Sequence, residues 1–353
     1  MYPHSLIDLS ELKANQLQEI LSLANDIKAD PKRYFGACEG KILATLFYEP
    51  STRTQMSFQT AMLRLGGETI GFDNPMNSSV SKGESLADTI RIVSGYADIL
   101  AMRHPFEGAA KAAALYTNCP IINAGDGGHL HPTQTLTDLV TIYGEKQTVS
   151  GLTIGMCGDL KNGRTVHSLV KTLCRNNNKF VFISTPELGL PQYILNLLEA
   201  SGCKCEFVTS LEEAIPQLDV LYMTRIQKER FASEKLYEEQ KNVYVLDAKK
   251  MLRAKADLIV LHPLPRVDEI TYEVDEDPRA LYFKQAKCGV YARMALIMKM
   301  LEGGQGREKL EGTPGARCTN PNCITSIEKY LPSTYKKDEN AAVETMLCEF
   351  CEH

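Results

Sequence analysis

Short apolar stretches alternate with helical patterns through residues 1–300 of this chain. Segments such as 54–65, 135–144 and 165–175 carry apolar residues at the 3.6-residue period of an amphipathic helix. The predicted strands are 41–48, 97–103, 120–124, 152–158, 179–185, 219–224, 242–247 and 256–262. Strands that alternate with helices predict a parallel sheet with helical crossovers, in which ligands bind beyond the carboxyl ends of the strands.

The same pattern divides the chain into three predicted regions. A polar, turn-rich segment at 143–151 lies near the midpoint and separates two α/β halves. We predict a first domain at 1–134, completed by the returning helix 284–302, and a second domain at 135–283. Region 303–353 begins with a helix-ending glycine linker and lacks the α/β rhythm. The predicted fold class is therefore α/β, with two doubly wound parallel-sheet domains and a small C-terminal domain.

Composition narrows the classes of function. Hydrophobic residues make up 44% and charged residues 24% of the 353 residues, as in ordinary globular proteins. The formal net charge of -5 gives no support to a nucleic-acid or acidic-membrane partner. No apolar stretch is long enough to span a membrane, and the N-terminus lacks the apolar run of a signal peptide. An odd number of cysteines, 11, without a signal peptide favours a cytoplasmic protein with free thiols.

A candidate phosphate site follows the first predicted strand. Pro50 ends that strand, and Ser51 or Thr52 can cap the helix that begins there. A helix N-terminus offers unpaired N–H groups and a partial positive charge. Arg53 adds a planar guanidinium that fits phosphate oxygens, and Thr54 belongs to the same turn. Taken alone, such a turn is more typical of an ordinary capped helix with a solvated arginine.

Two further strand ends carry basic side chains. Arg103 closes an apolar strand, where a surface ion pair is the alternative interpretation. His131 and Gln134 project from a helix start, because Pro132 suits the first turn of the next helix. A single histidine at such a position is more often a cap than a catalyst. Together with 51–54, these residues predict a pocket rich in hydrogen-bond donors and poor in acceptors, which suits a small, doubly charged phosphorylated substrate.

These motifs resemble the carbamoyl phosphate domain of the transcarbamoylases. The resemblance is carried by FYEPSTRT at 47–54, MRHP at 102–105 and HPTQ at 131–134, and it extends over residues 1–303. It implies the transcarbamoylase fold and transfer of a carbamoyl group from carbamoyl phosphate to an amine. It also implies that catalysis needs neither a metal nor an organic cofactor.

The resemblance implies a role for each residue of the pocket. The carbonyl oxygen gains negative charge during transfer, and Thr54, Arg103 and His131 are the candidate donors to it. The implied catalytic set is Arg53, Thr54, Lys82, Arg103 and His131. The implied carbamoyl phosphate ligands are Ser51, Thr52, Arg53, Thr54, Ser78, Arg103, His131, Gln134, Leu264 and Pro265. Lys82 is also expected to neutralise the leaving phosphate, and a cis peptide is expected before Pro265.

The second half of the chain distinguishes between possible acceptor amines. Arg164 and Arg225 lie at predicted strand ends, and two arginines facing one cleft suit a dicarboxylate, although either alone could be a surface charge. The strings GRTVHSL and TRIQ around them resemble aspartate carbamoyltransferases. Ornithine carbamoyltransferases differ by a Ser-Met-Gly element, absent here, and by His-Cys-Leu-Pro where this chain has HPLP. The implied L-aspartate ligands are Lys82, Arg164, Thr165, Arg225 and Gln227.

The polar loop 74–83 has two interpretations. An ordinary solvated surface loop is the simpler one. In the resembling family this loop reaches the active site of a neighbouring subunit, and Ser78 and Lys82 match its ligand-contacting positions. The resemblance therefore implies a homo-oligomer, a trimer or a multiple of one, with active sites shared between subunits.

Four cysteines near the C-terminus form a separate motif. Cys318, Cys323, Cys348 and Cys351 have the spacing C-x4-C-x24-C-x2-C, which suits tetrahedral coordination of a structural zinc ion. Four free thiols or two disulfides are the alternatives, and a cytosolic location disfavours disulfides. The motif resembles the zinc domain of aspartate carbamoyltransferase regulatory chains, which implies a fused module that helps to hold subunits together. Six Lys and Arg against eight Asp and Glu in 305–353 disfavour a nucleic-acid role.

Two other functions remain as alternatives. One is a sister transcarbamoylase that acts on another amine. The other is a catalytically inactive homologue whose zinc module makes it an assembly protein. Every expected pocket position holds the expected residue type. The sequence therefore favours an active enzyme that carbamoylates L-aspartate, a reaction of pyrimidine biosynthesis.

Overall fold

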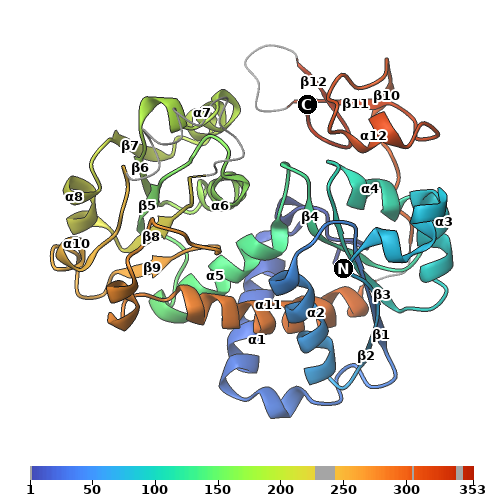
Figure 1. Cartoon of the computed structure of the whole chain (residues 1–353), viewed down its shortest axis with the longest axis horizontal. Helices are drawn as coiled ribbons and strands as arrows, with labels where there is room; N and C mark the ends of the chain where they lie inside the picture. Colours follow the sequence, from blue (N-terminus) through green and yellow to red (C-terminus); the bar gives the residue numbers. More distant parts are fainter. Residues whose placement is uncertain (1, 227–242, 304–305, 339–344) are drawn as a thin grey trace. The chain divides into compact units, whose positions relative to one another are not determined.

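The computed structural model describes residues 2–226, 243–303, 306–338 and 345–353. The chain divides into two compact units, Met1–Leu136 with Gly289–His353, and Thr137–Cys288 (Figure 1). The first unit therefore includes the C-terminal tail as well as the N-terminal part. Over the described ranges, no helix has both the length and the apolar character needed to cross a membrane.

A four-stranded parallel sheet forms the centre of the first unit, with the strand order β2-β1-β3-β4. The strands are β1 (Ile42–Phe47), β2 (Glu68–Phe72), β3 (Ile99–His104) and β4 (Ile121–Asp126). The helices are α1 (Ala14–Ala29), α2 (Thr52–Arg64), α3 (Leu86–Val93) and α4 (Ala109–Ala114). All residues of β3 and β4 are buried. Strand β3 is central, and the outer strand β4 is covered along its free edge by the N-terminal segment, where Leu6 forms a bridge with Ile122. The edge strand β2 is partly exposed and lacks an apolar run, so the sequence did not predict it.

The second unit contains a five-stranded parallel sheet with the order β7-β6-β5-β8-β9. The strands are β5 (Thr153–Cys157), β6 (Lys179–Ile183), β7 (Lys204–Val208), β8 (Val220–Met223) and β9 (Ile259–Leu261). The helices are α6 (Arg164–Leu173), α7 (Gln192–Ala200), α8 (Leu211–Ala214) and α10 (Ala248–Met251). The edge strand β7 is also largely exposed and was also not predicted. The predicted α/β class with two parallel sheets is confirmed.

The strand predicted at 242–247 is wrong, because its described residues form only an isolated bridge between Leu246 and Ile270. The Asp247 carboxylate accepts a hydrogen bond from the Lys250 N–H at 2.9 Å and caps α10. The apolar residues before it therefore belong to a buried loop that ends in a helix start, not to a sheet ladder.

Two long helices belong to both units. They are α5 (Pro132–Lys146) and α11 (Tyr282–Glu302), and α11 confirms the helix predicted at 284–302. Within the first unit the Arg293 guanidinium of α11 lies 5.0 Å from the ring centroid of Phe58 in α2. Short 3-10 helices lie at Leu9–Glu11, Pro31–Tyr34, Pro75–Asn77, Ser79–Lys82, Pro186–Leu188, Ile215–Gln217 and Tyr272–Glu276.

The C-terminal tail forms a small antiparallel sheet, β10-β11-β12, beside one short helix. These elements are β10 (Thr313–Pro314), α12 (Ile324–Ile327), β11 (Thr334–Lys337) and β12 (Met346–Cys348). In the described part of the tail, the buried apolar side chains besides the four cysteines are Ile324, Leu331 and Phe350. They join one hydrophobic cluster with the alanines of α4, next to which the tail lies in Figure 1. The tail is therefore too small for a core of its own and shares that of the first unit.

Candidate active site and metal centre

The predicted phosphate turn lies directly between β1 and α2. Helix α2 begins at Thr52 with Ser51 at the N-cap position, but the Ser51 side chain makes no capping hydrogen bond. Thr54 is buried, whereas Thr52 and Arg53 are exposed. The Ser51 side chain therefore does not cap α2, whereas the exposed Arg53 agrees with the solvated arginine of the alternative interpretation. A helix start that no side chain caps can bind an anion through its backbone N–H groups.

The strand order brings Arg103 beside this turn. Strands β1 and β3 are neighbours, and Phe47 pairs in register with Arg103. Burial, together with the charge of Arg103, lowers the pKa of Arg53 below its ordinary value. Two guanidinium groups that repel each other favour an anion between them. The two arginines thus create a positive potential that suits an anion such as phosphate.

Arg103 also contacts groups from two other positions. Its Nη1 lies 3.3 Å from Nε2 of His131, and its Nη2 forms a 2.6 Å ion pair with Oε1 of Glu49. Among the described groups its Nε, which is buried, has no hydrogen-bond partner. A Cβ atom at Gly125 would lie 3.0 Å from Arg103 Nη1 and 3.6 Å from His131 Cδ2, so this close approach requires a glycine. The buried guanidinium retains a donor for a ligand.

Glu49 is a residue that the sequence analysis missed. We predicted a pocket poor in acceptors, yet Glu49 places a carboxylate on Arg103. The available signal was its position directly before Pro50 in the string FYEPSTRT. Because a phosphate dianion binds the same guanidinium donors, it competes with Glu49 for Arg103.

His131 immediately precedes α5, whose first residue is Pro132. The Gln134 N–H donates to the His131 carbonyl at 3.0 Å, which is the first turn of that helix. His131 is buried and Gln134 is half-buried. Since β3 and β4 are adjacent, Arg103 and His131 both lie at the carboxyl end of the sheet. The structure therefore brings these two predicted residues together.

The loop 74–83 forms two short 3-10 helices, with Ser78 between them and Lys82 as the last residue of the second. The Ser78 hydroxyl donates to the Pro75 carbonyl at 2.7 Å and accepts from the Val80 N–H at 3.3 Å. Lys82 is exposed. The hydrogen bonds of the Ser78 side chain thus lie inside its own loop, and within one chain the structure does not join these two residues to Arg103.

In the second unit, Arg164 and Arg225 lie at the carboxyl ends of neighbouring strands. Arg164 begins α6 after β5, and Arg225 follows β8. The two segments approach closely, since a Cβ atom at Gly158 would lie 2.4 Å from the Thr224 carbonyl oxygen. Both arginines are half-buried, as is Thr165. Gln227 lies outside the described residues.

The HPLP turn follows β9. Its Leu264–Pro265 peptide bond is cis, as the resemblance implied. His262 is buried and holds the turn from both sides: Nδ1 accepts from the Leu264 N–H at 2.7 Å, and Nε2 lies 2.7 Å from Oε1 of Glu269. Burial opposes a charge on Glu269, but the hydrogen bond and charge of His262 hold its pKa below the ordinary value. This histidine therefore acts on the shape of the turn.

The four C-terminal cysteines form a compact cluster. The sulfur atoms of Cys318, Cys323, Cys348 and Cys351 lie within 4.8 Å of one another, and all four residues are buried. The Cys318–Cys351 and Cys323–Cys348 sulfur separations are 3.7 and 3.9 Å. These separations are too long for disulfides, and they match the roughly 3.8 Å between sulfurs that each lie about 2.3 Å from one zinc ion.

Hydrogen bonds among the four thiols shift their pKa values in opposite directions. Those from Cys323 and Cys351 lower the pKa of Cys348, whereas those from Cys323 and Cys348 raise the pKa of Cys351. A cluster of this geometry can hold a metal ion. With four sulfur ligands no position is left for water, so the donor set suits a structural ion.

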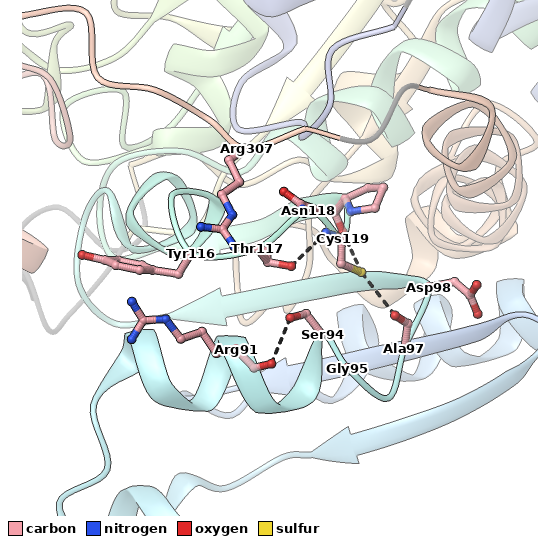
Figure 2. A pocket seen from close by; sticks show the side chains of 11 residues that line it. Arg91, Ser94, Gly95, Ala97, Asp98, Tyr116, Thr117, Asn118, Cys119 and Arg307 are labelled. Carbon is pink, nitrogen blue, oxygen red and sulfur yellow. Dashed lines mark hydrogen bonds between the residues drawn. The ribbon is translucent and has the colours of Figure 1, made fainter.

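A separate pocket lies at the other end of the first sheet. It has a volume of about 380 Å³ and includes Ala97, Asp98 and Pro120, which precede β3 and β4. Figure 2 shows Arg91 and Arg307 at its walls, and Arg91 lies 5.0 Å from the ring centroid of Tyr116. None of the predicted site residues lines this pocket.

Two family models match the chain. The carbamoyl-P binding domain of aspartate/ornithine carbamoyltransferase matches residues 4–144, and the Asp/Orn binding domain matches residues 150–300. The aspartate carbamoyltransferase catalytic subunit of Clostridium perfringens is 62% identical over 298 residues, which are 84% of this chain and 97% of the relative. That of Clostridium acetobutylicum is 60% identical over 299 residues, with the same coverage.

Solved structures agree with these relatives. The catalytic subunit of M. jannaschii aspartate transcarbamoylase has a TM-score of 0.80 and 49% identity, and the match covers 85% of this chain and 98% of that chain. Aspartate transcarbamoylase from Trypanosoma cruzi in complex with carbamoyl phosphate and aspartate has a TM-score of 0.78 and 39% identity, and the match covers 83% and 95%. The family models end at residue 300, before the cysteine cluster. The chain belongs to the aspartate/ornithine carbamoyltransferase family, among its aspartate carbamoyltransferase catalytic subunits.

Proposed function

We propose that this chain transfers the carbamoyl group of carbamoyl phosphate to L-aspartate, giving N-carbamoyl-L-aspartate and phosphate, in pyrimidine biosynthesis. The observation that carries the proposal is the contact of Arg103 with His131 beside the uncapped start of α2. The activity named for the 62% identical relative supports it, as do the ligands of the T. cruzi structure.

In the proposed reaction the neutral α-amine of L-aspartate attacks the carbamoyl carbon. A C–N bond forms, the C–O bond to phosphate breaks, and phosphate leaves with the electron pair. The departing phosphate accepts the proton that the amine loses. Donors are needed where the carbonyl oxygen becomes negative, and Thr54, Arg103 and His131 supply them. Arg103 is already buried against His131, so substrate binding has to displace Glu49 from the guanidinium but need not bring these two donors together.

The phosphate group binds at the start of α2. Ser51, Thr52 and Arg53 offer hydroxyl, backbone and guanidinium donors there. Arg103 supplies a second guanidinium, and Ser78 and Lys82 complete the phosphate site. Gln134 and the carbonyls of Leu264 and Pro265 orient the carbamoyl nitrogen, which fixes the carbon for attack.

L-Aspartate binds through its two carboxylates. Arg164 and Arg225 each grip a carboxylate with a planar fork, and their half-buried positions at neighbouring strand ends support this role. Thr165, Lys82 and Gln227 complete the aspartate site.

The proposed assembly is a homotrimer or a multiple of one, with Ser78 and Lys82 supplied by a neighbouring subunit. The exposure of Lys82 and the hydrogen bond that holds the Ser78 hydroxyl within its own loop support this arrangement. The test mixes two inactive variants, Arg53→Ala and Lys82→Ala. Recovery of part of the activity on mixing supports shared sites, whereas mixtures that stay inactive would exclude them.

We further propose that the four cysteines hold one structural zinc ion and that catalysis needs no metal. The sulfur separations and burial of the cluster support zinc. Elemental analysis of protein purified without chelator should give about one zinc per chain. Protein with all four thiols free and no bound metal would contradict the assignment. A cytoplasmic location fits both the thiols and the substrates.

The activity is tested by supplying carbamoyl phosphate with either L-aspartate or L-ornithine and measuring the carbamoylated product. Product with aspartate alone is the expected result. Product with ornithine alone would keep the phosphate site but overturn the roles of Arg164 and Arg225. No product with either would favour another acceptor amine or an inactive assembly protein.

A further inference from the structure

The C-terminal tail binds the first unit through the loop that follows Arg103. The Glu107 N–H donates to the Asn322 carbonyl at 2.8 Å, and the Ile324 N–H donates to the Glu107 carbonyl at 2.9 Å. The Glu107 carboxylate also accepts from Nδ2 of Asn320 at 2.7 Å. Backbone and side-chain hydrogen bonds from the tail thus fix the chain just after it leaves β3.

The tail also packs directly against the start of α4. Gly108 has a φ of +79°, and a Cβ atom there would lie 2.6 Å from both Cβ and the carbonyl oxygen of Phe350. The buried Glu349 carboxylate accepts a hydrogen bond from Nζ of Lys111 at 3.3 Å. No room remains for a side chain or for water between the two backbones, so tail and loop form one packed body.

A second connection runs through His129. Its Nε2 lies 3.4 Å from Oε2 of Glu352 in the tail, and its Nδ1 lies 3.2 Å from Oδ2 of Asp126. Asp126 is buried at the end of β4 and accepts hydrogen bonds from the Gly108 N–H at 2.8 Å and the Leu130 N–H at 3.0 Å. The Asp126 carboxylate therefore connects the start of α4, the His129 ring that contacts the tail, and the segment that leads into α5.

Two of the proposed catalytic side chains, Arg103 and His131, lie next to this network. Leu130 immediately precedes His131. His104 immediately follows Arg103, and its carbonyl accepts a hydrogen bond from the Gly127 N–H at 2.8 Å. The Arg103–His131 contact is 3.3 Å, so a shift of about 1 Å in either loop would remove it.

We propose that His129 is a positioning residue for carbamoyl transfer. Through it, the Glu352 carboxylate of the tail holds Arg103 and His131 in reacting geometry. The inference rests on the proposed function, because it assigns the tail to that same site. A tail that only joined subunits would leave the kinetics of an assembled protein unchanged. Loss of the Glu352–His129 contact instead weakens the carbamoyl phosphate site, whose Arg103 and His131 lie in the first unit, more than the aspartate site.

The test compares Glu352→Gln and His129→Gln with the unaltered full chain. We expect kcat/KM for carbamoyl phosphate to fall roughly tenfold, the scale of one weakened charge-assisted hydrogen bond, and KM for L-aspartate to stay within about twofold. Lys336→Gln is the matched control. Nζ of Lys336 binds the other oxygen of Glu352 at 3.3 Å, so its loss leaves the contact with His129 in place. This control should keep kcat/KM at the level of the unaltered chain.

Two further measurements keep the outcomes distinct. Zinc content and thermal unfolding verify that each variant is folded, and calorimetry gives carbamoyl phosphate affinity without turnover. If His129→Gln does not fold, Glu352→Gln decides alone, since the Glu352 side chain is 30% exposed. Unchanged affinity and kcat/KM in Glu352→Gln would overturn the inference. An unaltered chain that carbamoylates no acceptor would contradict the proposed function, and carbamoyl phosphate affinity in the variants would still decide the role of His129.

Discussion

The two-sheet body, residues 4–300, and the tail that follows it are held in shape by different physical means. The body buries its central parallel strands on both faces, and its proposed ligands lie at the strand ends. The tail has three short strands and few buried apolar side chains in its described part. Its shape depends on the cysteine cluster and on the packing of Phe350 against Gly108. We therefore expect the body to keep its fold without the tail, and the tail to need both the body and the proposed zinc ion.

Loss of one cysteine should have the largest effect and should be confined to the tail. Cys348→Ser removes one of the four proposed zinc ligands, and structural zinc binding is worth on the order of 10 kcal/mol in small domains. We expect loss of the metal and of hydrogen-exchange protection in β12, while β1 and β5 stay protected. Elemental analysis and hydrogen exchange provide the two measurements. Collapse of protection in β5 as well would show that the body depends on the tail.

Loss of one phosphate ligand should have the converse effect, confined to chemistry in the body. Arg53→Ala removes an exposed guanidinium from the start of α2. We expect kcat/KM to fall by about 10²–10³, since donors to a developing anion contribute on that scale. Zinc content and the midpoint of thermal unfolding should not change. Steady-state kinetics and metal analysis test this prediction. Activity within a few fold of that of the unaltered chain would show that Arg53 is not part of the site.

Acid should destabilise the body through two buried histidines. Burial lowers the pKa of His104 and of His167 to about 4. Because both are depressed below the unfolded value of about 6.5, the unfolded chain binds more protons as the pH falls. The stabilisation is complete above about pH 6.5 and is lost as the pH falls through about 4, by up to about 3 kcal/mol each.

Urea unfolding at several pH values between 4 and 7.5 measures this dependence. His167→Gln should flatten the curve, because it keeps a polar side chain against the Leu160 carbonyl without titrating. A variant with the same pH dependence as the unaltered chain would exclude His167 as a source.

The smallest expected effect lies at the junction of body and tail. Gly108→Ala places a methyl group against Phe350, whereas Gly40→Ala has a similar positive φ, +72°, and nothing within 4 Å. Alanine at a positive φ costs about 1 kcal/mol in both variants, so the difference between their effects measures the clash with Phe350. We expect Gly108→Ala alone to make the tail sensitive to limited proteolysis. Equal sensitivity in the two variants would show that Phe350 does not need this close approach.

Much of the fold followed from periodicity, and the exceptions are two exposed edge strands and one apolar loop. The predicted central strands are present because fully buried strands leave continuous apolar runs. The edge strands β2 and β7 leave no such run, since one side faces solvent. The segment before Asp247 shows the opposite error, because a buried loop produced the same apolar pattern as a strand.

Sequence motifs indicated the candidate site residues, but not the residues that contact them in the structure. Motifs identified Arg103 and His131, which lie 28 residues apart and meet at 3.3 Å. No local pattern indicated that Glu49 binds Arg103, or that the Ser51 hydroxyl leaves the start of α2 uncapped. A hydrogen bond depends on tenths of an ångström, and sequence patterns do not fix position at that scale.

By itself the sequence determined which side chains lie at the strand ends and which four cysteines form a cluster. Its hydrophobic periodicity also indicated the type of most helices and strands. Those properties are local, since they depend on residues a few positions apart. Only the tertiary structure decided which strand ends are neighbours and where the tail binds. His129 and Glu352 are 223 residues apart, and their contact exists because strand order and the shared core of α4 bring them together. Such contacts form only when distant segments of the chain pack against each other, which is a property of the whole fold.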